Sequence, residues 1–87
     1  MKYRNEKEVA ERVLKELEDE LEGICSYDCL YKMLKEHDMD DEAIVIEHIA
    51  SDEYRHAERL WRMLGKFEID IPQRYHDLWS KVEDIFD

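Results

Sequence analysis

Apolar residues recur along two long stretches of the chain in steps that alternate between three and four. That spacing keeps them on one face of an α-helix, so it predicts a helix over about residues 5–36 and another over about residues 41–64. Asn5 is the expected N-cap of the first helix, and Asp38 or Asp40 that of the second. Because so few residues separate the two helices, we expect them to pack as an antiparallel hairpin.

A third, shorter helix is predicted over about residues 72–86, after a corner that ends at Pro72. The residue before a proline avoids helical angles, and proline itself favours the first turn of a helix. This segment has an apolar side but no cluster of metal-ligand residues, so its expected role is packing against the hairpin or a neighbouring chain. The pattern therefore predicts an all-α fold with a single domain over residues 1–87, a long antiparallel helical hairpin plus a short C-terminal helix.

Three polar side chains interrupt the apolar faces of the two long helices. The face of the first helix consists of Val13, Leu17, Glu20, Ile24, Tyr27, Tyr31 and Leu34. The face of the second consists of Ile46, Ile49, Glu53, His56, Leu60, Met63 and Phe67. Burying a carboxylate or an imidazole is costly unless a partner pairs with it, which makes Glu20, Glu53 and His56 the candidate functional residues.

A shared metal ion is the partner that these three residues favour. Glu53 and His56 are three residues apart, so both side chains can reach one ion. Glu20 lies about 18 residues before the turn and Glu53 about 15 after it, which at ~1.5 Å per residue puts them at similar heights. One hairpin then supplies half of a carboxylate-bridged dinuclear site, and two copies related by a two-fold axis complete it in a four-helix bundle. The ligand set suits Fe, Mn or Zn without choosing among them.

The same residues have an alternative interpretation. A buried Glu and His can pair with each other, or with Arg55 or Arg59, and bind no metal. The protein is then a non-enzymatic helical dimer in which the charged positions only fix the register, as buried polar residues do in coiled coils.

Composition narrows the classes of partner. The chain has 87 residues and a formal net charge of −11. Nucleic acids and anionic membrane surfaces repel such a chain, so neither is an expected partner. It has no apolar run of the roughly 18 residues that span a bilayer, and residues 1–7 lack the apolar core of a secretory signal, so we expect a cytoplasmic protein. The hydrophobic core of so short a chain gives only marginal stability by itself, so we expect a metal ion or a second chain to stabilise the fold.

The other cysteine and histidine residues fall outside the candidate group. Cys25 and Cys29 are four residues apart, unlike a Cys-x-x-Cys pair, and in a reducing cytosol we expect free thiols packed as small apolar side chains. A thiolate ligand or a disulfide between chains is the alternative. His37, His48 and His76 are expected at the surface, with a peripheral metal contact as the alternative for His48.

Two segments resemble a known family. Residues 20–28, with Glu20 and Tyr27 seven residues apart, and residues 51–57, with an Asp-Glu-x-x-His-Ala pattern, are similar to the encapsulated ferritins. These are two-helix members of the ferritin-like, rubrerythrin-related group. The resemblance covers roughly residues 13–66.

The resemblance implies a ferroxidase, an enzyme that oxidises Fe(II) to Fe(III) with oxygen or peroxide for iron storage and detoxification. In that family a di-iron centre forms between two chains, and its iron ligands match Glu20, Glu53 and His56. Glu53 of each chain is the expected bridging ligand. A tyrosine beside the centre matches Tyr27. Acidic residues of a secondary or entry site for metal ions match Asp19, Glu22 and Asp52.

The resemblance also implies partners. Dimers of the family assemble into a larger ring and are housed in an encapsulin shell, so a second chain, further dimers and a shell protein are expected. A rubrerythrin-like peroxidase is a further alternative, although the chain has no Cys-x-x-Cys pair to hold a rubredoxin iron.

Overall fold

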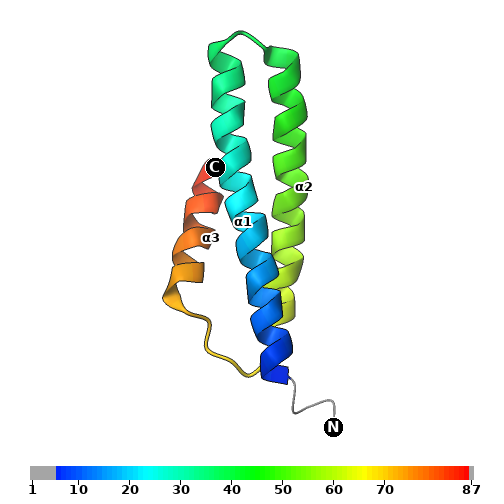
Figure 1. The fold of residues 1–87 in the computed structure, drawn as a ribbon, viewed down its shortest axis with the longest axis vertical. Coiled ribbons are helices and arrows are strands. Elements are labelled where there is room, and N and C mark those ends of the chain that lie inside the picture. Colours follow the sequence, from blue (N-terminus) through cyan, green and yellow to red (C-terminus); the bar gives the residue numbers. More distant parts are fainter. Residues whose placement is uncertain (1–5, 87) are drawn as a thin grey trace.

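The computed structural model describes residues 6–86, which form three helices and no strand. α1 spans Glu6–Glu36, α2 spans Asp40–Leu64 and α3 spans Gln73–Phe86 (Figure 1). The predicted all-α class is confirmed, and the ends of the helices lie within about a residue of the predicted ones. Asn5, the predicted N-cap of α1, lies outside the described residues.

α1 and α2 run antiparallel and are joined by a tight turn at residues 37–39 (Figure 1). Asp38 has a φ of 58°, a left-handed conformation that aspartate tolerates better than most side chains. The backbone N–H of Met39 then donates to the carbonyl oxygen of Leu34 at 2.9 Å and closes the end of α1. The prediction that Asp38 or Asp40 is the N-cap of α2 is wrong. Met39 is the N-cap and makes no side-chain capping bond, because Asp38 forms the turn and Asp40 already lies inside the helix.

α1 and α2 meet through small residues of α2. The buried residues of α2 are spaced seven apart and are Ala43, Ala50, Ala57 and Leu64. Opposite them, the buried residues of α1 are Ala10, Val13, Leu14, Leu17, Leu21 and Ile24. Alanine lets the two backbones approach closely while the larger side chains of α1 fill the space. The buried stripe of α2 therefore lies beside the predicted one, in which Ile49 is 36% and Met63 44% exposed.

α3 packs against one face of the hairpin, along the half that lies away from the turn (Figure 1). Its Tyr75 and Val82 are buried. The ring of Trp79 stacks on those of Tyr54 and Trp61 in α2, with centroid distances of 5.6 and 5.0 Å. The third helix thus packs against its own hairpin, one of the two roles that the sequence allows.

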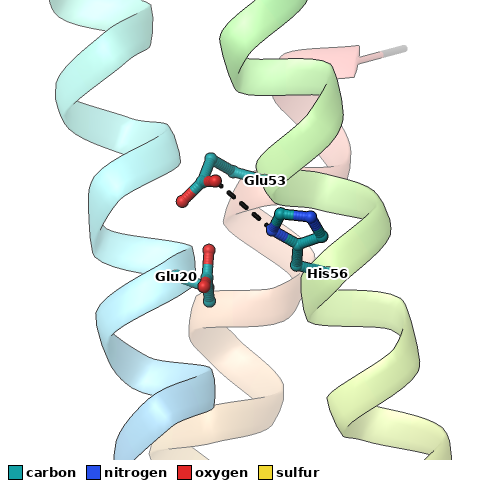
Figure 2. A group of neighbouring side chains, drawn as sticks. All are labelled: Glu20, Glu53 and His56. Atoms are coloured by element: carbon teal, nitrogen blue, oxygen red, sulfur yellow. Dashed lines mark ion pairs between the residues drawn. The ribbon is translucent and has the colours of Figure 1, made fainter.

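The opposite face of the hairpin is left open by the rest of the described chain. Figure 2 views this face, with α3 passing behind α1 and α2. Helical spacing places Ile49 and Met63 on the same face as Glu53 and His56, and Val45, one turn before Ile49, is 56% exposed. Exposed apolar side chains gathered on one face are typical of an interaction surface. None of the described helices is long and apolar enough to cross a membrane.

Candidate metal centre

Three side chains from two helices point toward one another on the open face (Figure 2). Glu20 comes from α1, and Glu53 and His56 come from α2. One possible ligand atom from each residue lies within 4.8 Å of those of the other two. His56 Nδ1 is 3.4 Å from Glu53 Oε1. A single chain therefore assembles two carboxylates and an imidazole, and we call these three residues the ligand group.

The local fold explains why the ligand group forms. Glu53 and His56 are three residues apart in α2, so they lie on adjacent parts of one helix face. The antiparallel hairpin brings Glu20 to the same height, because it lies about as far before the turn as Glu53 lies after it. Ala57, next to His56, is fully buried and keeps α1 close to α2 at this level.

One oxygen of Glu20 lacks a partner. Its Oε2 is buried, and no hydrogen-bond donor in the described residues reaches it. Leaving a buried oxygen unpaired is costly, so such an atom calls for an explanation. The chain's arginines do not supply one within residues 6–86, since none forms an ion pair with the ligand group, and Arg55 pairs with Asp52 at 2.8 Å instead.

The two carboxyl groups perturb one another. The pKa of Glu20 is raised from 4.5 to about 7. The largest cause is hydrogen bonding to the Glu53 carboxyl group, followed by burial and by repulsion from the negative charge of Glu53. Two carboxyl groups in this position share a proton or take up a cation. A metal ion and a proton therefore compete for Glu20 near neutral pH.

The donor set fits a divalent transition metal ion. Carboxylate oxygens and imidazole nitrogens bind such ions at about 2.0–2.2 Å, so two ligands of one ion are at most about 4.4 Å apart. The present separations, within 4.8 Å, need only small side-chain rotations to meet that limit. Solvent reaches the group, because the His56 side chain is 50% exposed and that of Glu53 29%. Three protein ligands leave coordination positions for further ligands.

The ligand group is only partly covered within the single chain. Glu20 and Glu53 are half-buried and His56 is exposed. The physical reason is that alanines of α2 make the contact with α1, so the ligand group lies at the edge of that contact. The seven-residue spacing of Ala43, Ala50 and Ala57 is the signal in the sequence that points to this arrangement.

Tyr27, the predicted neighbour of the centre, lies two turns from Glu20 along α1. There it lines a cavity of about 220 Å³ together with Tyr31, Ile46 and Phe86. Its role beside a metal centre stays a prediction.

The predicted entry residues lie on the outer surface of the hairpin. Asp19, Glu22 and Asp52 are exposed. Asp19 pairs with Lys15 at 2.9 Å, and Asp52 pairs with Arg55. None of the three joins the ligand group in the described part of the chain. A secondary or entry site at these residues stays a prediction.

The other cysteine and histidine residues lie apart from the ligand group. Cys25 and Cys29 are free thiols, the first half-buried and the second exposed. His37, His48 and His76 are exposed, as the sequence predicts.

Comparison of the chain with models of protein families, with curated proteins and with solved structures finds no match. The resemblance to encapsulated ferritins therefore depends on residues 20–28 and 51–57 alone, and the ligand group carries the functional argument.

Proposed function

We propose that two copies of this chain form a ferroxidase, which binds a di-iron centre at the dimer interface and oxidises Fe(II) to Fe(III) for iron storage or detoxification. The observation that carries the proposal is the convergence of Glu20, Glu53 and His56 on the open face of the hairpin. The unpartnered Oε2 of Glu20 supports it, because a bound cation would satisfy that oxygen.

The dimer follows from the number of ligands. A dinuclear carboxylate site in a four-helix bundle takes four Glu and two His, and each chain supplies half of that set. The ligand group lies on the face that α3 leaves open, where Ile49 and Met63 are exposed. A second hairpin placed across this face would bury those side chains and bring the second half of the site.

Iron is the substrate in this proposal. Two Fe(II) ions each lose one electron, and oxygen or hydrogen peroxide takes up the electrons and protons to give hydrogen peroxide or water. Glu20, Glu53 and His56 of each chain would hold the ions, and the Glu20 carboxyl group would release its proton when an ion binds. Mn and Zn suit the same ligands, so the reaction with Fe(II) rests on the family resemblance.

The resemblance also supports a larger assembly. We propose that the dimers join into a ring, and that an encapsulin shell is the partner that stores the oxidised iron. Tyr27 would lie beside the centre as a hydrogen-bonding neighbour of a ligand. Asp19, Glu22 and Asp52 would attract ions from solution toward it.

Anaerobic titration with Fe(II), followed by addition of oxygen and assay of the remaining Fe(II), tests the proposal. The parent chain should bind one Fe(II) per chain and oxidise it. Glu53→Ala and His56→Ala should lower binding and oxidation at least about 10-fold, because each removes a ligand. Glu42→Ala and His37→Ala are the matched controls, since both remove an exposed side chain of the same type and should behave like the parent.

Two other outcomes would favour the alternatives. Unchanged iron binding and oxidation in Glu53→Ala and His56→Ala would overturn the ferroxidase and leave the role of fixing the register. Faster turnover with hydrogen peroxide than with oxygen would favour a rubrerythrin-like peroxidase at the same residues.

A further inference from the structure

Gly23 lies one turn beyond Glu20, inside the 31-residue helix α1. Glycine weakens the interior of a helix relative to alanine, so its presence there calls for a physical reason. The backbone does not supply one, because none of the described glycines has a positive φ. Packing within the chain does not supply one either. A Cβ added at Gly23 would meet no other part of the described chain within 4 Å.

The space beside Gly23 opens onto the face that carries the ligand group. Gly23 is three residues from Glu20 and four from Tyr27, so helical spacing puts it on the same side of α1. Leu30, seven residues further along the same side, is 38% exposed. The missing side chain therefore leaves bare backbone next to Glu20, on a surface that residues 6–86 do not cover.

We infer that Gly23 is the point at which the second chain comes closest to α1. This inference rests on the proposed function, because it needs the dimer that completes the metal centre. Small residues at a helix crossing let two backbones approach, as the alanines of α2 do within the hairpin. At Gly23 the absence of a side chain would allow the same close approach between two chains. It lets the partner helix come near enough for its ligands and Glu20 to share one centre.

Two substitutions at Gly23 and one matched control test the inference. Gly23→Leu and Gly23→Ala add side chains that favour a helix and meet no other part of the described chain at the Cβ position. Cys29→Leu adds the same leucine six residues further along α1, at an exposed position about 120° round the helix from Gly23. For each variant, circular dichroism gives the helix content and sedimentation equilibrium gives the dissociation constant of the dimer.

Gly23→Leu should keep its helix content and raise the dissociation constant of the dimer at least about tenfold. Gly23→Ala should raise it by a smaller factor although it strengthens the helix, and it decides the matter if Gly23→Leu loses helix content. Cys29→Leu should dimerise like the parent. Dimers of normal affinity in both Gly23 variants, together with normal iron oxidation in the parent, would overturn this inference alone. A parent chain that stays monomeric with and without Fe(II) would overturn the proposed function as well.

Discussion

Glu20 is the residue on which the candidate centre depends most. Its carboxyl group lies beside that of Glu53, and its buried Oε2 has no partner in the described residues. The sequence allows the position of Glu20 to be predicted, because helical spacing and the hairpin turn set its height. It does not reveal the unpaired oxygen, because that depends on which arginines reach the site. Arg55, which the sequence suggests as a partner of the ligand group, forms an ion pair with Asp52 instead.

The raised pKa of Glu20 predicts how the stability of the metal-free chain depends on pH. Below pH 4.5 the carboxyl group is protonated in both the folded and the unfolded chain. Between pH 4.5 and about 7 the unfolded chain loses this proton while the folded chain keeps it, so stability falls as pH rises. Glu20→Gln should remove this contribution, because the amide does not titrate.

Urea unfolding with a chelator present, from pH 4 to pH 8, measures the effect. The free energy of unfolding of Glu20→Gln minus that of the parent should increase across this window and level off above about pH 7. Glu22→Gln, which changes an exposed neighbour, should show a much smaller change. A difference between Glu20→Gln and the parent that does not vary with pH would contradict the assignment.

At the scale of the helices, the alternation of three and four residues predicts the two long helices, and the short connection between them predicts their antiparallel pairing. Pro72 and the apolar side of the segment after it predict the third helix. The details of contact are not readable in the same way. The apolar pattern predicts that large side chains such as Ile49 and Met63 form the contact face of α2. In the structure, alanines of α2 make the contact with α1. The cap of α2 is also missed, because Asp38 has two competing uses and the turn takes it.

The alanine contact predicts a large effect of added volume. Ala57 is 0% exposed between α1 and α2. Ala57→Leu should therefore force the helices apart and lower the free energy of unfolding by about 1–3 kcal/mol. Chemical denaturation measures this, with Arg59→Leu as the control because Arg59 is an exposed residue of the same helix and has a similar helix propensity to leucine. Equal stability of the two variants would show that the contact tolerates the extra volume.

At the scale of the whole molecule, the chain is a hairpin with one covered face and one open face. α3 accounts for the covered face through the stacked rings of Tyr54, Trp61 and Trp79. The open face holds the ligand group together with exposed apolar residues. The sequence predicts that the three ligands meet, but it does not tell which face α3 takes, because both faces of the hairpin carry apolar residues. The dimer and its assembly stay proposals, because one chain does not show how a second chain packs against it.

Native mass spectrometry of the chain after anaerobic loading with Fe(II) tests the shared centre most directly, because it reports the oligomer and its metal content together. The proposed site predicts that iron is carried by even-numbered oligomers, with the dimer as the smallest iron-bearing species and one iron per chain. Monomers that carry iron at full occupancy, or dimers that carry none, would contradict it.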